Sequence, residues 1–448
     1  MTITPSFSSS APTARFPEET QSAGNLSPLR DGLAQSDPEI AAALLREEER
    51  QRRGLELIPS ENYAFPEVLA LLGSVFTNKY SEGYPGRRYY GGQENTDIVE
   101  ELARERAKAL FGAEHANVQP LSGSPMNQAV YLGFLEVGDP ILAMDLSHGG
   151  HLTHGAPVSH MGKLFDFTRY KTDGEGHIDF GAVREAALRT RPKMIVCGHS
   201  SYPRDIDYRA FKEIADEVGA LTMADVSHTA GFIAAGLLNN PMEAGFDFMT
   251  TTTHKSMRGP RGGLILTRVA HAKKLDASVF PGLQGGPHMN QVAATATTLK
   301  LVGEGAFKAY AHQVLENAKA LANALAARQI KLVTGGTENH LMVIDTEASF
   351  GMSGDEAQRL LDEIGLTTNK QVIPDDPRPP MRPSGIRLGT PAPTARGMGK
   401  SEMESIAAMI ASALSADAGK REEMLPALAA EAEALCARFP VPKLGAAK

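Results

Sequence analysis

Short apolar runs alternate with amphipathic stretches along most of the chain after about residue 96. Runs rich in β-branched residues are typical of strands, whereas apolar residues spaced by three or four are typical of helices. We predict strands at 116–121, 139–146, 194–198, 221–228, 247–254 and 262–268. We predict helices at 96–112, 127–135 and 207–219. This alternation predicts a mostly parallel sheet that helices cover on both faces.

The helix predicted at 96–112 carries its apolar residues on one side. Ile98, Leu102 and Leu110 lie near one face of the helix, and Gly112 is placed to end it. The last predicted strand of this region follows the preceding strand after only a short turn. We therefore expect these two strands to be antiparallel neighbours.

Both ends of the chain differ from this alternating pattern. Residues 1–36 are rich in Ser, Thr and Pro, and we expect a disordered extension there. Residues 37–303 would form an N-terminal arm and the large domain, and the arm begins with a helix that Asp37 caps and Gly54 ends. After about residue 304, alanine-rich helices accompany short strands, which predicts a smaller α+β domain at 304–448.

Charge and cysteine content narrow the classes of function. Lysine plus arginine number 45 against 53 acidic residues, and the net charge of −8 argues against a general nucleic-acid binder. Two cysteines cannot form a disulfide framework, so a reducing compartment is the default and we expect a cytoplasmic protein. No apolar run is long enough to cross a membrane, and the first residues lack the apolar core of a secretory signal. A transit peptide is the alternative, which acidic residues near the start disfavour.

One lysine follows four consecutive threonines at the end of the strand predicted at 247–254. Open α/β sheets bind their ligands at such strand ends. His254, Arg258 and Arg261 are neighbours of Lys255 in sequence, and nearby cations lower the pKa of an amine and raise its nucleophilicity. A partly neutral lysine forms a Schiff base with an aldehyde, and pyridoxal 5′-phosphate is the commonest aldehyde cofactor. A solvated surface lysine is the alternative.

Pyridoxal phosphate requires an acid at its ring nitrogen and a cradle for its phosphate. Asp225 ends the strand predicted at 221–228 and would keep the ring nitrogen protonated; a helix cap or a salt bridge is the alternative. Ser122, Gly123 and Ser124 join a strand to a helix, where hydroxyl and backbone N–H groups suit a dianionic phosphate. An ordinary helix cap is the alternative for this turn.

Histidines crowd the end of the strand predicted at 139–146 and could hold the cofactor ring. His148, His151 and His154 are spaced by three, so a metal site is an alternative. Glycines disrupt a helix here, and no nearby acid completes the ligand set. One histidine stacked on an aromatic cofactor therefore fits the segment better. His228 is a further candidate for contact with cofactor or substrate, or else a hydrogen-bonded core histidine.

The segment between about 55 and 95 is irregular and aromatic, with four tyrosines within 80–90. Aromatic loops of this kind seldom remain bare in water. We expect this one to be buried against its own chain or against a partner.

Six ordered motifs together resemble the serine hydroxymethyltransferase family. The motifs are NKYSEGYPGRRYYGG, SHGGHLTHG, DVSHTAGFIAAG, TTTTHKSMRGPRGG, FPGLQGGP and SGIRLGTP, and the resemblance extends from about residue 37 to the end. It implies an α/β, aspartate-aminotransferase-like pyridoxal-phosphate enzyme of fold type I. Its large domain would contain a mostly parallel seven-stranded sheet, followed by a smaller C-terminal α+β domain. The implied reaction of one-carbon metabolism moves a one-carbon unit between serine and tetrahydrofolate, giving glycine and 5,10-methylenetetrahydrofolate.

The resemblance also implies which residues bind the cofactor. Lys255 would bear the Schiff base, Asp225 would pair with the pyridine nitrogen, and His151 would stack on the ring. The further contacts that it implies are Ser122, Gly123 and Ser124 at the phosphate, Ser200 and His228 at the 3′-oxygen, and Gly286 and Tyr80 from a second subunit.

Substrate contacts follow from the same resemblance. Arg387 would bind the substrate carboxylate through a bidentate pair, assisted by Ser60. Glu82 would be the proton-transfer carboxylate, and Tyr80 and Tyr90 would come from the neighbouring subunit. The implied partners are therefore small molecules and a second copy of the chain, as a homodimer or a dimer of dimers with shared active sites.

Thr251 and His254 shortly precede Lys255, and each has a candidate role in the site. The hydroxyl of Thr251 would contact substrate or cofactor, or else satisfy a neighbouring backbone group. His254 would influence substrate specificity, and no resident metal is expected. The implied folate pocket comprises Leu146, Gly150, His151, Leu152 and Met381.

The sequence departs from many members of the family in the folate region. Gln371 stands where many have Asn, and 379–381 replaces a Ser-Pro-Phe triplet; elsewhere, Leu121 replaces a histidine. Hence a 2-methylserine (D-alanine) hydroxymethyltransferase and a folate-independent β-hydroxy amino acid aldolase are alternatives. A catalytically silent scaffold or RNA-binding protein is a remote alternative, disfavoured by the intact catalytic residues and the acidic charge.

Overall fold

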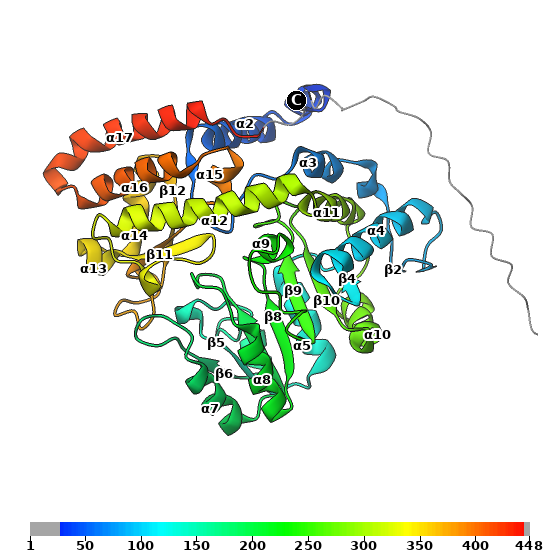
Figure 1. The fold of residues 1–448 in the computed structure, drawn as a ribbon. Coiled ribbons are helices and arrows are strands. Elements are labelled where there is room, and N and C mark those ends of the chain that lie inside the picture. The colour runs from blue at the N-terminus through cyan, green and yellow to red at the C-terminus, as the bar shows by residue number, and fades with distance from the viewer. Residues whose placement is uncertain (1–26, 443–448) are drawn as a thin grey trace, which may run out of the picture.

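A seven-stranded sheet forms the centre of the large domain in the computed structural model, which describes residues 27–442 (Figure 1). The strands are β4 His115–Asn117, β5 Pro140–Met144, β6 Asp166–Tyr170, β7 Met194–Gly198, β8 Leu221–Asp225, β9 Phe248–Thr252 and β10 Gly263–Thr267. Their order is β4-β10-β9-β8-β7-β5-β6, and β10 is antiparallel to both of its neighbours. The predicted, mostly parallel sheet is confirmed. Strand β6 was not predicted, because polar residues interrupt the apolar run of this edge strand.

Helices cover both faces of this sheet because consecutive strand residues point to opposite sides. Leu142 and Ile195 pack in one core with residues of α7 and α8, whereas Ala143 and Val196 pack in another with residues of α5. The helices of this domain are α3 Pro66–Leu72, α4 Glu94–Phe111, α5 Gly123–Phe134, α6 Met161–Leu164, α7 Phe180–Thr190, α8 Tyr208–Val218, α9 Ala230–Ala234, α10 Val269–Ala277 and α11 Met289–Val302. Short helical turns are η1 Val75–Asn78, η2 Leu146–His148 and η3 Ser278–Leu283.

A smaller α+β domain follows, with its own core and a three-stranded sheet of order β11-β14-β13. Its elements are α12 Gly305–Ala326, η4 Val333–Gly335, β11 Leu341–Asp345, α13 Thr346–Phe350, α14 Gly354–Glu363, β12 Leu366–Thr367, β13 Asn369–Gln371, β14 Gly385–Gly389, α15 Pro391–Ala395, α16 Lys400–Ser415 and α17 Ala418–Arg438. The long helix α12 begins on the large-domain core and ends on the small-domain core. Figure 1 shows it running between the two.

The N-terminal arm joins the small domain rather than lying apart from it. Strand β1, Leu55–Glu56, pairs in parallel with β12, so this segment packs with the small domain although it precedes the predicted boundary at residue 304. Asp37 caps α2, Pro38–Arg53, by accepting from the backbone N–H of Ile40 at 3.1 Å.

The remaining elements before the large sheet are α1, Ser27–Ser36, and the hairpin of β2, Gly83–Tyr84, with β3, Arg87–Arg88. Helix α1 occupies the last ten residues of the segment that was expected to be disordered; residues 1–26 lie outside the described part of the chain. Within residues 27–442, no helix has both the length and the apolar composition that a membrane span requires.

Candidate active site

The carboxyl ends of β5, β7, β8 and β9 lie along one edge of the large sheet because these strands are parallel. Strand β8 ends at Asp225, and Lys255 follows the end of β9. His151 follows β5, and Ser200 follows β7. Ligands of open α/β sheets bind outside the carboxyl ends of the strands. The topology therefore brings the predicted cofactor residues to the edge where a ligand is expected.

Lys255 is partly buried at this edge. Burial lowers the pKa of its amine to about 8; Asp225 opposes this shift, whereas Arg387 and Arg261 add to it. A sizeable fraction of the amine is then neutral near pH 8, as attack on an aldehyde requires. The predicted contribution of Arg258 is not found, because its Nε donates to a backbone carbonyl at 2.9 Å and its guanidinium lies over aromatic rings.

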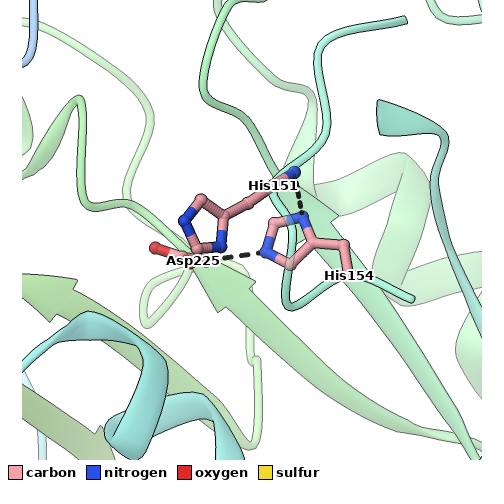
Figure 2. Close-up of side chains that lie close together, drawn as sticks. All are labelled: His151, His154 and Asp225. Atoms are coloured by element: carbon pink, nitrogen blue, oxygen red, sulfur yellow. Dashed lines mark hydrogen bonds and ion pairs between the residues drawn. The ribbon is translucent and has the colours of Figure 1, made fainter. Parts of the chain in front are cut away.

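The carboxylate of Asp225 is the centre of a hydrogen-bond network (Figure 2). Its Oδ2 accepts from Nδ2 of Asn127 at 2.8 Å and lies 3.4 Å from Nε2 of His154. Its Oδ1 accepts from the backbone N–H of Ser227 at 3.1 Å and from the hydroxyl at 2.6 Å. Burial alone raises the pKa of Asp225, but the hydrogen bond from His154 and neighbouring basic groups outweigh burial and lower it. The carboxylate is therefore ionised at neutral pH, as the partner of a protonated ring nitrogen must be.

Backbone donors determine the tautomers of the two histidines in Figure 2. The N–H of His151 donates to Nδ1 of His154 at 3.2 Å, so Nε2 of His154 carries a hydrogen and points at Asp225. The N–H of Thr153 donates to Nδ1 of His151 at 3.2 Å. Burial lowers the pKa of His151 to about 4, so this ring is neutral and can lie against an aromatic ligand.

The structure brings together a different set of possible metal ligands from the three histidines that the sequence suggested. Ligand atoms of His151, His154 and Asp225 lie within 4.8 Å of one another, so the acid that the sequence segment lacked comes from another strand. His148 is not part of this group, because its Nε2 lies 3.5 Å from Asp375 instead. Hydrogen bonds already engage Nδ1 of His151, both nitrogens of His154 and both oxygens of Asp225. The arrangement is therefore better suited to holding an anionic carboxylate than to ligating a metal.

The threonines of β9 divide between two roles. The hydroxyl of Thr250 donates to Oδ1 of Asn127 at 2.8 Å, and Asn127 in turn donates to Asp225. The hydroxyl of Thr251 donates to the backbone carbonyl of Thr252 at 2.8 Å, which is the structural alternative to a catalytic role. Among the described residues, no hydrogen bond links the hydroxyl of Thr251 to Lys255 or Asp225, so its catalytic role stays a prediction. Thr250 and Asn127 are site residues that were not predicted.

The turn from Ser122 to Ser124 begins α5, as predicted. Ser122 is the N-cap, yet its side chain makes no capping hydrogen bond. A Cβ on Gly123 would lie 2.8 Å from Cγ2 of Thr252, so the turn packs against the end of β9 more closely than another residue allows. The hydroxyls and free N–H groups at this helix start are available to a phosphate beside the lysine.

Arg387 reaches the site from β14 of the small domain and is only 9% exposed. Its Nε donates to Oδ1 of Asn369 at 3.1 Å, and its Nη1 donates to the carbonyl of Ser200. Its Nη2 makes no hydrogen bond within the described chain. Burial lowers the pKa of Arg387 to about 10, which leaves it charged at neutral pH and able to bind a carboxylate.

Ser60, His228 and His254 lie around these groups. The N–H of Gly389 donates to the carbonyl of Leu57 at 2.7 Å, which places the segment before Ser60 beside the end of β14. Burial lowers the pKa of His254 to about 3, with Arg261 and Lys255 contributing. His228 is buried directly after β8, and burial holds its pKa well below the ordinary value.

A model of the serine hydroxymethyltransferase family matches residues 33–410. The match spans both domains and every residue of the site described above. The chain belongs to the serine hydroxymethyltransferase family. Members of this family are fold-type I pyridoxal-phosphate transferases of the hydroxymethyltransferase class, which act on serine and glycine and use tetrahydrofolate.

The site in this member of the family fits pyridoxal phosphate. We call Lys255, Asp225, His151, His154 and Arg387 the lysine site. A lysine of lowered pKa suits the aldehyde, an ionised aspartate suits the ring nitrogen, and a neutral histidine suits the ring face. The uncapped start of α5 suits the phosphate.

Four other predicted residues form a separate group, the tyrosine cluster of Tyr80, Glu82, Tyr90 and Gly286. The hydroxyl of Tyr90 donates to Oε2 of Glu82 at 3.4 Å, and the rings of Tyr80 and Tyr90 meet edge to face with centroids 5.2 Å apart. A Cβ on Gly286 would lie 3.2 Å from Cε1 of Tyr80. Tyr80 is 57% exposed and Tyr90 47%. Within the described residues, no hydrogen bond or ion pair joins this cluster to the lysine site.

The predicted folate residues lie largely at the surface of the chain. Leu146, Leu152 and Met381 are 39%, 49% and 75% exposed. Gly150 is buried, and a Cβ there would lie 2.3 Å from the carbonyl oxygen of Met144, so this turn requires glycine. The three apolar side chains leave surface available to a folate ring system.

Proposed function

We propose that this chain transfers the hydroxymethyl group of L-serine to tetrahydrofolate, giving glycine and 5,10-methylenetetrahydrofolate, with pyridoxal phosphate bound covalently to Lys255. The observation that carries the proposal is a lysine whose pKa burial lowers to about 8, next to an ionised Asp225, in a chain of this family. The bound cofactor supplies an electron sink for the electrons released when the Cα–Cβ bond of serine breaks.

Each residue around the cofactor has a separate task in this proposal. Asp225 keeps the ring nitrogen protonated, and His154 with Asn127 holds that carboxylate in place. His151 lies against the ring, and Ser122 to Ser124 bind the phosphate. His228 and Ser200 bind the 3′-oxygen.

Arg387 binds the carboxylate of the amino acid. Its guanidinium is fixed by Asn369 and by the carbonyl of Ser200, so a charged donor edge is already oriented before substrate arrives. Ser60 adds a hydroxyl to the same carboxylate. This arrangement selects α-amino acids, because the carboxylate and the amino group must reach Arg387 and Lys255 together.

The tyrosine cluster supplies the proton-transfer group from a second subunit. Glu82 acts on the serine hydroxyl, Tyr80 and Tyr90 flank it, and Gly286 approaches the phosphate of the neighbouring site. Support comes from the exposure of both tyrosines in the single chain and from the absence, among the described residues, of any contact between Glu82 and the lysine site. The assembly is then a homodimer or a dimer of dimers. We expect a cytoplasmic location for the protein.

A related hydroxymethyltransferase activity, on 2-methylserine and D-alanine, is the second candidate. Gln371 and the segment 379–381 depart from many members of the family in the folate region, and the lysine site would serve 2-methylserine and D-alanine equally well. Folate-independent cleavage of β-hydroxy amino acids would use the same groups. His254, which immediately precedes the lysine, is the candidate for setting this preference. An inactive scaffold or RNA-binding protein would need no such lysine site.

One assay separates these functions. The purified protein, supplied with pyridoxal phosphate, should become yellow and should convert L-serine to glycine in a tetrahydrofolate-dependent reaction. Glycine and D-alanine are then compared as acceptors, with and without the folate. A faster reaction with D-alanine would favour the related hydroxymethyltransferase activity, and equal rates without folate would favour the aldolase. A colourless protein with no turnover would refute the proposal.

A further inference from the structure

The side chains of the tyrosine cluster have few partners, but buried polar groups hold the backbone on either side of Glu82. Arg88 in β3, Glu100 in α4 and Gln119 just after β4 form this group, which we call the buried triad. The side chain of Arg88 is 3% exposed and that of Glu100 is 0% exposed. Gln119 is buried as well. The proposed function gives none of the three a task.

The guanidinium of Arg88 donates to four acceptors. Its Nη1 donates to the carbonyls of Ser81 and Gly83 at 3.0 and 2.9 Å, and these are the two neighbours of the proposed proton-transfer residue. Its Nη2 donates to Glu100 at 2.6 Å, and its Nε donates to Asp97 at 2.8 Å. Because the guanidinium is planar and rigid, it fixes these two peptide groups of the hairpin relative to α4.

Gln119 contacts the same hairpin and a second segment. Its Nε2 donates to the carbonyl of Gly83 at 2.9 Å and to Oε1 of Glu100 at 2.8 Å. Both partners are acceptors, so the amide nitrogen must face them, and the amide oxygen has no hydrogen-bond partner among the described residues. The backbone carbonyl of Gln119 accepts from Nε2 of Gln284 at 2.7 Å, two residues before Gly286. One buried residue therefore contacts both segments that the proposed function assigns to the neighbouring site.

The backbone turns sharply directly after Glu82. Gly83 has a φ of 95°, and a Cβ there would collide with the carbonyl oxygen of Arg87, so only glycine suits this turn. The side chain of Glu82 has just one hydrogen bond among the described residues, the long one from Tyr90. The direction of the Glu82 carboxylate therefore depends on the peptide groups that the buried triad holds.

Stability alone does not explain a buried ion pair at this place. Taking two charges out of water costs free energy, and an apolar pair of similar volume is often as stable or more stable. Apolar side chains, however, could not bind the carbonyls of Ser81 and Gly83. The triad is thus suited to fixing the hairpin in one orientation.

We propose that Arg88, Glu100 and Gln119 are positioning residues that set the direction in which Glu82 projects toward the site of the neighbouring subunit. The triad holds the peptide groups before and after Glu82, so the carboxylate is oriented before it meets the serine hydroxyl. The inference rests on the proposed function, in which Glu82 transfers the proton. It extends that function to three residues that act through Glu82.

Two variants of nearly unchanged size test this role. Gln119→Met removes the donor to Gly83, and Glu100→Gln leaves one amide oxygen to accept from both Arg88 and Gln119. In the holoenzyme, each should lower kcat for tetrahydrofolate-dependent cleavage of L-serine roughly tenfold, as small misplacements of a reacting group do. Cofactor absorbance should stay at the wild-type level. Glu101→Gln, the same change at the adjacent, half-exposed residue of α4, is the control and should leave kcat unchanged.

The fold of the variants is checked by thermal unfolding. If either single variant does not fold, Arg88→Met combined with Glu100→Met takes its place, because removing both charges together leaves no unpaired charge in the core. This double variant should show the same loss of kcat, since the carbonyls of Ser81 and Gly83 lose their donor.

A double-mutant cycle separates positioning from a general loss of structure. If the triad acts through Glu82, Gln119→Met should lower kcat about tenfold in the wild-type background but not in the Glu82→Gln background, where the carboxylate is already absent. Equal losses in both backgrounds would overturn the inference, and so would wild-type kcat in the triad variants. If Glu82→Gln itself reacts at the wild-type rate, or if the wild-type protein does not bind the cofactor covalently, the proposed function fails and this inference fails with it.

Discussion

The lysine site and the tyrosine cluster differ in how completely a single chain builds them. Around Lys255, hydrogen bonds from three segments of one chain hold Asp225, and Arg387 is oriented before any ligand binds. The tyrosine cluster has one long hydrogen bond of 3.4 Å, and its tyrosines are about half exposed. A buried polar group must find its partners within the fold, whereas an exposed aromatic group is free to find them on another chain. Substitutions in the lysine site should therefore impair cofactor binding, whereas substitutions in the tyrosine cluster should lower the reaction rate and leave cofactor binding intact.

Replacing the lysine should have the largest effect. Lys255→Ala removes the amine placed to bond with the cofactor aldehyde, so turnover of L-serine should fall to background and the visible absorbance of bound cofactor should be lost. Lys319→Ala, on an exposed part of α12, is the control and should behave as wild type. Normal turnover by Lys255→Ala would show that the lysine site is not the reaction centre.

A change in the tyrosine cluster should spare the cofactor. Glu82→Gln keeps the size of the side chain but removes its proton-transfer capacity, which commonly costs on the order of a hundredfold in rate. Cofactor absorbance should remain at the wild-type level, because no residue of the lysine site contacts Glu82 in the described chain. The measurement is steady-state cleavage of L-serine with tetrahydrofolate. An unchanged rate would mean that Glu82 has only a structural role.

The pH dependence of cofactor capture tests the electrostatics of the lysine site. Only the neutral amine attacks the aldehyde, and burial lowers the pKa of Lys255 to about 8. The capture rate should therefore rise roughly tenfold per pH unit below that value and level off above it. Because Asp225 raises the pKa of Lys255, Asp225→Asn should move the midpoint to lower pH. Stopped-flow absorbance measures this, and a midpoint near the ordinary lysine value of 10.5 would contradict it.

The smallest predicted effect separates two adjacent threonines. Thr250→Val removes the hydroxyl that orients Asn127 toward Asp225 and should weaken cofactor binding by a few-fold, as loss of one hydrogen bond does. Thr251→Val removes a hydroxyl that bonds only to the backbone and should leave cofactor affinity unchanged. The two variants are matched in shape and position. Equal affinities, or a larger loss in Thr251→Val, would reverse the assignment of roles within β9.

Strand ends made the centre of the lysine site predictable. Lys255 and Asp225 follow apolar, β-branched runs, and the carboxyl ends of parallel strands meet at one edge without further information. Asn127 and Thr250 were not predicted, because they act through contacts between segments that are distant in sequence. Asn127 is 98 residues from Asp225 and 123 from Thr250 in sequence. No local pattern marks a residue whose partner lies that far along the chain.

Helix α4 shows a different limit of sequence patterns. Ile98 and Leu102 were expected to form its apolar face, yet they are 58% and 42% exposed. The buried side of the helix carries Ala103, Ala107 and Phe111 together with Glu100, which is paired with Arg88 at 2.6 Å. Periodicity identifies the helix but does not say which chain covers each face. The exposed pair on α4, like the tyrosine cluster, is surface that a second subunit would cover.

The central claim is that Lys255 of one subunit works with Glu82 of another. It is tested most directly by co-expressing Lys255→Ala and Glu82→Gln chains with different tags and purifying the mixed dimers through both tags. If the site is shared, one of the two sites in each mixed dimer contains both intact residues, so about half of wild-type activity should return. If each chain uses its own Glu82, no intact site forms, and activity should stay near a hundredth of wild type or below.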